Sequence, residues 1–159
     1  MALAHEKLYR SPAMARIEFD QYLEELVIHL QNVHQVDPNL VHVRMDLEPI
    51  SLNITTAIPC GLVANELLMN VFTHAFPPGR LGVLDIRFRR LEDGRIELMV
   101  RDDGVGIPPE IDFRTSESLG LQIITLLTSQ IDGAIDVVHG AGTEFRITFE
   151  EKKAKTRLV

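Results

Sequence analysis

Two short segments of this chain carry the residue types that a metal-bound anion needs. In Asn65-Glu66-Leu67-Leu68-Met69-Asn70, a carboxylate and an amide stand four residues apart, so on a helix they share one face. In Asp102-Asp103-Gly104-Val105-Gly106, two carboxylates precede glycines that let the backbone approach a ligand closely. Carboxylate and amide oxygens suit Mg²⁺, which also binds water and phosphate oxygens. Together the segments predict a pocket for a metal-bound nucleotide.

The polar residues of the first segment extend into a stripe without lysine or arginine. The stripe recurs at helical spacing on an otherwise apolar stretch, through Glu66, Asn70, Thr73 and His74. The alternative explanation for such a stripe is the solvated face of an amphipathic helix. Asp102 ends a predicted strand, where its carboxylate can accept a hydrogen bond from an exocyclic amine. A tight turn is the alternative explanation for the aspartates and glycines that follow.

Two further glycine-containing segments fit the same chemistry. Ser118-Leu119-Gly120-Leu121 opens a predicted helix, whose free backbone amides and close-approaching glycine suit a phosphate. Gly142-Thr143 begins the last predicted strand. A capped helix start and a hairpin glycine explain these segments without a ligand, so each signal is weak by itself.

Composition bounds the class of protein. The 159 residues suffice for one domain with a core, and 45% apolar and 25% charged residues are ordinary for a soluble protein. The net charge of −7 argues against a nucleic-acid partner. The single cysteine, Cys60, excludes an intrachain disulfide and favours a reducing compartment.

Without an apolar run of about 18 residues or a signal-peptide pattern, we expect a cytoplasmic fragment that makes no membrane contact. A membrane anchor elsewhere in the full-length protein stays open.

Periodicity predicts the elements that must position these residues. Helical spacing predicts a first helix over about 21–34, with Asp20 as its N-cap. A long helix is predicted to reach about Phe76, with Thr55 or Thr56 as its cap and Pro59 in its first turn. Leu119–Ile131 is predicted to form the third helix. Alternating apolar residues predict strands, over about 41–48, 84–88, 96–100, 134–139 and 143–149, with a short partner strand over 51–54.

Hairpin signals then predict the fold class. Glu92-Asp93-Gly94 and His139-Gly140-Ala141-Gly142 require antiparallel pairing of the strands on either side. One apolar face per strand requires helices on one side only. The sequence therefore predicts an α+β fold: a two-layer α/β sandwich with a mixed, mostly antiparallel sheet and helices packed on one face.

The order of these segments resembles the sequence boxes of the GHKL ATPase superfamily, which has the Bergerat fold. The N, G1, G2 and final boxes are matched by Asn65-Glu66-x-x-x-Asn70, Asp102-x-Gly104-x-Gly106, Leu119-Gly120-Leu121 and Gly142-Thr143. The strings NELLMNVFTHAF, VRDDGVGIP, SLGLQII and GTEFRITF, with the leading HEKLY, are similar to the ATP-binding catalytic domain of a sensor histidine kinase. The resemblance covers roughly residues 5–149.

The resemblance implies a role for each matched residue. Asn70 resembles the Mg²⁺ ligand and Glu66 the acidic residue that assists the metal or its water, so both are candidate catalytic residues. Asp102 resembles the carboxylate that reads the adenine amino group, and Thr143 the threonine that helps seat adenine. The remaining expected nucleotide contacts are Thr73, His74, Gly104, Gly106, Ile107, Ser118, Leu119, Gly120 and Leu121. The segment 107–117 would form a short lid over ATP.

The resemblance also implies partners. The γ-phosphate of Mg-ATP would pass to a histidine on a dimerisation domain of the same full-length protein, with a response regulator downstream. Residues 1–18 resemble the end of that dimerisation region and a connector, 19–150 the catalytic domain and 151–159 a charged tail. Because no phosphoacceptor block is present, His5 is not the expected acceptor, and we expect the isolated chain not to phosphorylate itself.

One departure from the family pattern keeps alternatives open. Thr73 stands where the family often has lysine, which puts one phosphate contact in doubt. One alternative is a degenerate module that binds nucleotide or a partner without transferring phosphate. The other is a different GHKL enzyme, either a hydrolysing ATPase or an anti-sigma-type serine kinase.

Overall fold

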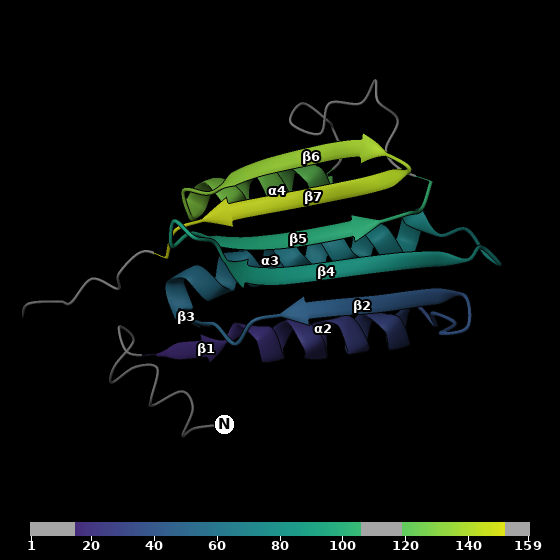
Figure 1. The fold of residues 1–159 in the computed structure, drawn as a ribbon, viewed down its shortest axis with the longest axis horizontal. Coiled ribbons are helices and arrows are strands. Elements are labelled where there is room, and N and C mark those ends of the chain that lie inside the picture. The colour runs from purple at the N-terminus through teal and green to yellow at the C-terminus, as the bar shows by residue number, and fades with distance from the viewer. Residues whose placement is uncertain (1–14, 106–118, 152–159) are drawn as a thin grey trace, which may run out of the picture.

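The computed structural model describes residues 15–105 and 119–151, and these form a five-stranded sheet covered on one face by helices (Figure 1). The helices are α2 (Phe19–Val33), α3 (Ile54–Asn70) and α4 (Leu119–Gln130). Helix α3 continues directly into a π-helical turn, η2 (Val71–Ala75). A separate two-stranded ribbon pairs β1 (Arg16–Glu18) with β3 (Ser51–Asn53).

The main sheet is mixed, and the order of its strands explains why. From one edge to the other it contains β2 (Val41–Leu47), β4 (Gly82–Arg90), β5 (Ile96–Asp102), β7 (Gly142–Phe149) and β6 (Ala134–Gly140). Strands β2 and β4 pair in parallel, because α3 carries the chain back between them, and the other neighbours are antiparallel. The predicted α+β fold with helices on one face is confirmed.

The core lies between the sheet and the helix layer. Leu84, Ile86 and Phe88 of β4 are fully buried, as are Leu98 and Val100 of the adjacent β5. The helices meet them with apolar side chains that include Phe19, Leu23, Val27, Val63, Leu67, Leu68 and Ile124. Burial of each large apolar side chain contributes about 1.5–3 kcal/mol, so this layer holds the helices firmly against the sheet.

The structure corrects three details of the predicted helix ends. Helix α3 is capped by Asn53, whose side-chain oxygen accepts a hydrogen bond from the Thr56 N–H at 3.0 Å, rather than by a threonine. Pro59 lies inside α3 and not in its first turn. The N-cap of α2 is Glu18, and Asp20 lies in the first helical turn, where its charge favours the helix dipole.

The long helix also differs from prediction at its end. Only Ile54–Asn70 is α-helical, and the last turn, Val71–Ala75, has the wider π-helical geometry. The whole stretch Ile54–Ala75 is long and apolar enough to cross a membrane by length and composition, but 56% of its most apolar window is buried inside the domain. It is therefore the central helix of the core, lying behind β4 and β5 (Figure 1).

Candidate functional site

Glu66 and Asn70 of α3 face the first turn of α4. A Cβ atom placed on Gly120 would lie 3.1 Å from Glu66 Oε2 and 3.7 Å from Asn70 Oδ1. Such a Cβ would be tight against the Glu66 carboxylate and in ordinary contact with Asn70, so the glycine leaves room between the start of α4 and the two polar groups. Both side chains are half-buried. The structure thus brings together three of the residues that the sequence singled out.

Asp102 lies at the end of β5, opposite Thr143 of β7. Its carboxylate is buried, with the residue 6% exposed, and it accepts a hydrogen bond from the Gly104 N–H at 2.9 Å. The backbone N–H of Thr143 donates to the same carboxylate. Because each carboxylate oxygen has two lone pairs, these two bonds leave capacity for a further donor such as an exocyclic amine.

Burial raises the pKa of the Asp102 carboxyl above its usual range. The two backbone hydrogen bonds oppose that rise, and the positive charge of Arg80 opposes it further. The neighbouring carboxylate of Asp103 acts in the other direction and adds to the rise. The site therefore holds a partly desolvated carboxylate whose charge depends on its immediate hydrogen-bond donors.

The turn after Asp102 docks on the end of η2. The Ala75 carbonyl oxygen accepts a hydrogen bond from the Val105 N–H at 3.0 Å. A Cβ on Gly104 would collide with this same carbonyl, so glycine is required at that position. Since η2 continues α3, the segment that carries Glu66 and Asn70 is joined directly to the turn that carries Asp102.

Gly142 allows β7 to start beside Asp102. It has φ +108°, and a Cβ at this position would collide with the Asp102 carbonyl group. Thr143, the next residue, is 5% exposed. Gly142 and Thr143, the last pair of residues that the sequence singled out, therefore lie beside the carboxylate of Asp102.

Other predicted contacts are not brought together by the described part of the chain. Thr73 and His74 lie on η2 with exposed side chains, and neither side chain makes a hydrogen bond or ion pair with another described residue. Leu121 packs in the hydrophobic core. Leu119 begins α4. Gly106, Ile107, Ser118 and the expected lid over 107–117 lie outside the described residues.

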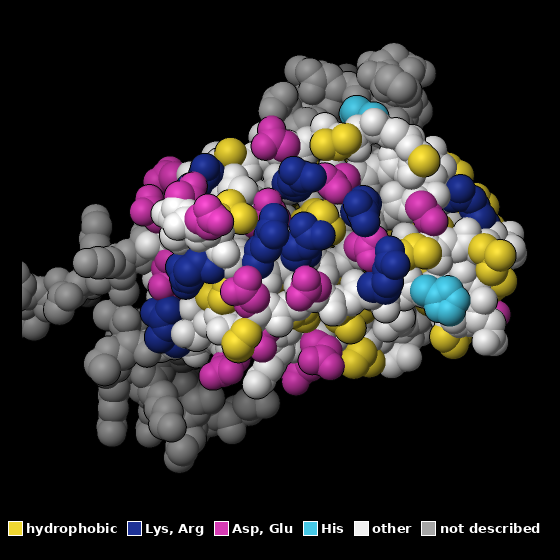
Figure 2. Space-filling model, viewed as in Figure 1, with side chains coloured by type: hydrophobic (Ala, Val, Ile, Leu, Met, Phe, Trp, Pro, Cys, Tyr) yellow, Lys and Arg dark blue, Asp and Glu magenta, His cyan; other side chains and the backbone are white. Residues whose placement is uncertain are grey.

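The face of the sheet that the helices leave uncovered carries a charged cluster, which the sequence analysis did not identify. Figure 2 shows basic and acidic side chains interleaved over this face. Asp85 of β4 accepts hydrogen bonds from Arg44 Nε at 2.6 Å and from Arg101 Nη2 at 2.9 Å. These contacts lower the pKa of Asp85. The strand register, which places Arg44 and Arg101 on either side of Asp85, is the signal that would have found the cluster.

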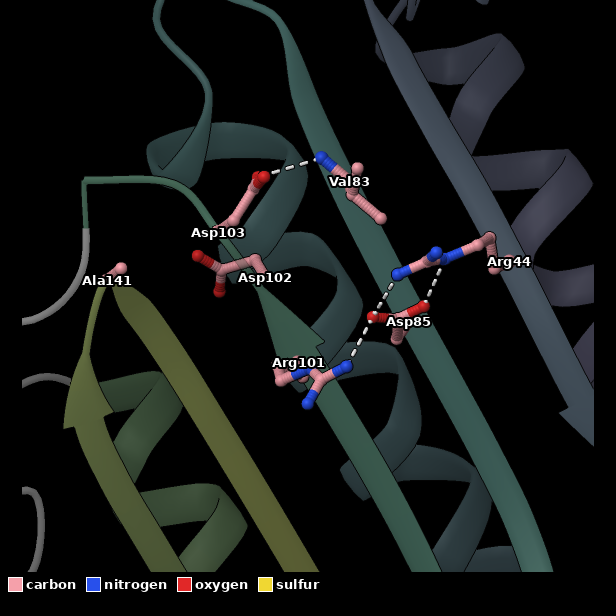
Figure 3. Close-up of a pocket in the computed structure, with 7 residues that line it drawn as sticks. All are labelled: Arg44, Val83, Asp85, Arg101, Asp102, Asp103 and Ala141. Carbon is pink, nitrogen blue, oxygen red and sulfur yellow. Dashed lines mark hydrogen bonds and ion pairs between the residues drawn. The ribbon is translucent and has the colours of Figure 1, made fainter.

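A cavity of about 330 Å³ lies beside this cluster at the end of the sheet (Figure 3). It is lined by Arg44, Val83, Asp85, Arg101, Asp102, Asp103 and Ala141. The two arginines point toward Asp85, and Asp103 points toward the Val83 N–H (Figure 3). The cavity touches Asp102 but contains none of the α3 or α4 residues, so it is separate from the Glu66, Asn70 and Gly120 cluster.

The side chains of the candidate site indicate which metal ion it could hold. Within the described ranges, no group of three or more histidine, cysteine, aspartate or glutamate side chains could hold a metal ion alone. Glu66 and Asn70 instead offer two oxygen-bearing side chains beside the start of α4. That set suits Mg²⁺, which commonly takes one or two protein ligands and completes its shell with water and phosphate oxygens.

Comparison with known proteins identifies the family. The sequence profile described as "Histidine kinase-, DNA gyrase B-, and HSP90-like ATPase" matches residues 56–153, more than half of the chain. The chain belongs to this ATPase family. A second profile, described as "Histidine kinase", matches residues 1–34. The predicted resemblance is confirmed, and membership of this ATPase family makes the domain an ATP-binding one.

Curated relatives place the domain among the sensor kinases of this ATPase family. The sensor histidine kinase PdtaS of Mycobacterium tuberculosis is 31% identical over 138 residues, covering 85% of this chain and 27% of that protein. Blue-light-activated histidine kinase 2 of Erythrobacter litoralis is 28% identical over 119 residues, covering 74% of this chain and 34% of that protein. The chain thus spans about a quarter to a third of these relatives. The matches support an ATP-binding catalytic domain of a sensor histidine kinase and do not favour the alternatives.

A solved structure agrees with this placement. The histidine kinase domain of the Erythrobacter litoralis EL346 blue-light activated histidine kinase superposes with a TM-score of 0.78 at 25% identity. The superposition covers 85% of this chain and 62% of that one. The mycobacterial sensor histidine kinase MprB shares the fold, with a TM-score of 0.67 at 21% identity over 85% of this chain and 97% of that chain.

Proposed function

We propose that this domain binds Mg-ATP between α3, α4 and the turn after β5, and presents the γ-phosphate to a histidine of a dimerisation domain in the same full-length protein. The observation that carries the proposal is the continuous connection from Glu66 and Asn70, through η2 and the Ala75 carbonyl, to the turn of Asp102 and Gly104. Two polar clusters suited to opposite ends of a nucleotide are joined by the hydrogen bond from the Val105 N–H to the Ala75 carbonyl.

The proposed role of each residue follows from the chemistry of its side chain or backbone. Asp102 would accept a hydrogen bond from the adenine amino group, and Thr143 would help seat the ring. Glu66 and Asn70 would hold Mg²⁺, which when bound neutralises phosphate charge. The first turn of α4, where Gly120 leaves room for a ligand, would direct backbone N–H groups at the phosphates. Catalysis then consists of positioning and charge stabilisation, as is usual in phosphoryl transfer.

The remaining nucleotide contacts belong to the same proposal. Thr73 and His74 on η2 would reach the phosphates from the side of α3. Gly104 and Gly106 would pass beside the nucleotide, and Ile107 would contact it from the start of the lid. Ser118, Leu119 and Leu121 would contribute where α4 begins.

The phosphoacceptor and downstream partner are inferred from the relatives. PdtaS and the blue-light-activated enzyme are named as histidine kinases, and this chain covers only part of their length. The acceptor histidine is therefore assigned to a dimerisation domain of the full-length protein, and a response regulator receives the phosphate from it. The domain would operate in the cytoplasm, where ATP is available.

The metal site provides the test of this proposal. Asn70→Ala should abolish the part of ATP affinity that depends on Mg²⁺ and keep most of the affinity measured in excess chelator, because the adenine pocket is untouched. Isothermal titration of ATP with and without Mg²⁺ measures both. Asn32→Ala makes the same change at an exposed position of α2 and should alter neither. Equal losses with and without Mg²⁺ would show that Asn70 is structural, and absence of ATP binding by the wild-type chain would overturn the proposed function.

A further inference from the structure

Arg80 lies at the junction between the two halves of the proposed site. It follows the segment Pro77-Pro78-Gly79, and its N–H donates to the Pro77 carbonyl at 3.1 Å, which closes a tight turn. Gly79 has φ +81°, a conformation that glycine adopts without strain. The turn directs the Arg80 side chain back between the end of η2 and the segment after β5.

The Arg80 guanidinium bridges two backbone segments. Its Nη2 donates to the Asp103 carbonyl at 3.1 Å, and its Nη1 donates to the Ala75 carbonyl at 3.4 Å. The Ala75 carbonyl also accepts the Val105 N–H. One side chain therefore fastens the turn that follows Asp102 to the last residue of η2.

The other side of this turn is fixed independently. Asp103 Oδ1 accepts the Val83 N–H at 2.8 Å, and the Asp103 N–H donates to the Val83 carbonyl at 3.2 Å. These bonds attach the turn to β4 without involving Arg80. Loss of Arg80 should therefore leave the sheet intact while loosening the turn on the side of η2.

Several charged groups surround Asp102, and their arrangement gives Arg80 a second effect. Asp103 is the adjacent carboxylate, and on the outer face Arg44, Asp85 and Arg101 share a cavity with Asp102. Both of those arginines hydrogen-bond to Asp85, and Arg101 also lies 3.8 Å from Glu144, whereas the charges that act on the Asp102 carboxyl are those of Asp103 and Arg80. Arg80 donates only to uncharged carbonyls among the described residues, and its positive charge favours the ionised Asp102.

We propose that Arg80 is a positioning residue for adenine recognition, which holds the Asp102-Asp103-Gly104 turn against η2 and supplies a favourable positive charge to the Asp102 carboxylate. The proposal rests on the proposed role of Asp102. Arg80 is exposed, so it contributes little to the core, and its contacts are aimed at the turn rather than at a neighbouring carboxylate.

The test compares Arg80→Gln and Arg80→Lys with a matched control. Arg90→Gln removes another exposed arginine that donates to one main-chain carbonyl, that of Gly94 at 3.1 Å, in the hairpin at the far end of β4. Two quantities are measured: ATP affinity by calorimetry at pH 7, and the titration midpoint of the Asp102 carboxyl by carbon NMR in the absence of nucleotide. Circular dichroism and a thermal melt confirm that each variant is folded.

Arg80→Gln should weaken ATP binding by about three- to tenfold, the usual range for one lost hydrogen-bonding group. It should also raise the titration midpoint of Asp102. Arg80→Lys keeps the charge but not the fork of donors, so it should restore the midpoint and only part of the affinity. Arg90→Gln should change neither quantity.

Two results would overturn the proposal: wild-type affinity and midpoint in Arg80→Gln, or equal affinity losses in both Arg80 variants with an unchanged midpoint, which would mark a purely structural role. Failure of the wild-type chain to bind ATP would instead remove the proposed function. The two failures are distinguishable because the titration is recorded without nucleotide.

Discussion

Asp102, the proposed adenine-binding residue, is a carboxyl group whose burial disfavours its charged form. Its carboxyl has a raised pKa because it is buried, so between its unfolded and folded pKa values the folded state binds more protons than the unfolded state. Stability therefore falls as the pH rises through that window. Above it, the folded domain carries the full cost of an ionised buried group, which is the cost expected for the proposed role of Asp102 in binding adenine.

The first residue-scale prediction follows from that cost. Asp102→Asn should lower ATP affinity by about ten- to a hundredfold, since a charge-assisted hydrogen bond contributes about 1.5–3 kcal/mol. The same variant should melt at pH 7 no earlier than the wild type, because it removes the buried charge. Calorimetry and thermal melts measure the two effects, and Asp136→Asn, at an exposed position of β6, is the control.

The pH dependence sharpens this prediction. ATP affinity of the wild type should fall as the pH is lowered through the raised pKa of Asp102, whereas Asp102→Asn should lack this component. Unchanged affinity in a folded Asp102→Asn protein would remove Asp102 from the adenine site.

The residues of the site were predicted to different extents. Glu66, Asn70, Asp102 and Gly120 could be selected as candidates because their types and spacing suit the same ligand. Arg80 could not, because its role depends on carbonyl groups of Ala75 and Asp103 that approach it only in the folded chain. A charged residue after a proline-glycine turn is otherwise an ordinary surface residue.

At the scale of elements, the boundaries of α3 show where periodicity stops being informative. Asn53, Thr55 and Thr56 are all suitable caps, and the choice falls on Asn53 because β3 pairs with β1 up to that residue. The π-helical turn at the end of α3 could not be predicted from a pattern that assumes 3.6 residues per turn. Likewise, alternation identified the more buried face of β2, although Met45 on that face is exposed, and it did not predict the parallel pairing with β4.

The start of β7 gives an element-scale prediction. Gly142→Ala should destabilise the domain by about 1–3 kcal/mol, since alanine resists φ near +108° and its Cβ would collide with the Asp102 carbonyl. Gly140→Ala is the matched control, because its Cβ would meet open space and its φ is not positive. Denaturant unfolding measures both.

A Gly142→Ala protein as stable as Gly140→Ala would mean that the hairpin adjusts freely. The close approach of β7 to Asp102 would then not depend on glycine.

For the molecule as a whole, the proposed division of labour predicts what the chain cannot do alone. None of its six histidines lies in a segment that resembles a phosphoacceptor block. We expect the isolated chain to bind ATP, to be mainly monomeric and to form no acid-labile phosphate with labelled ATP. Positioning of the acceptor supplies much of the rate in phosphoryl transfer, and we expect the surface that positions it to belong to the dimerisation domain.

Addition of the segment that bears the acceptor histidine should restore labelling. Sedimentation and a phosphorylation assay on the chain alone test the first expectation. Acid-labile phosphate on this chain by itself would place the acceptor within residues 1–159. The division into 1–18, 19–150 and 151–159 stays a prediction.

The ribbon at the edge of the domain brings the two ends of the described body together. Arg16 Nη2 lies 2.9 Å from Glu151 Oε1, and the other oxygen of Glu151 accepts the Asn53 N–H at 3.1 Å. The chain thus enters and leaves the domain at one point. A unit with that property can be inserted into a loop of another protein, or have its ends fused and a new break opened elsewhere, without rebuilding its sheet. Because its two ends lie close together, the domain should be suitable for insertion into chimaeric sensors.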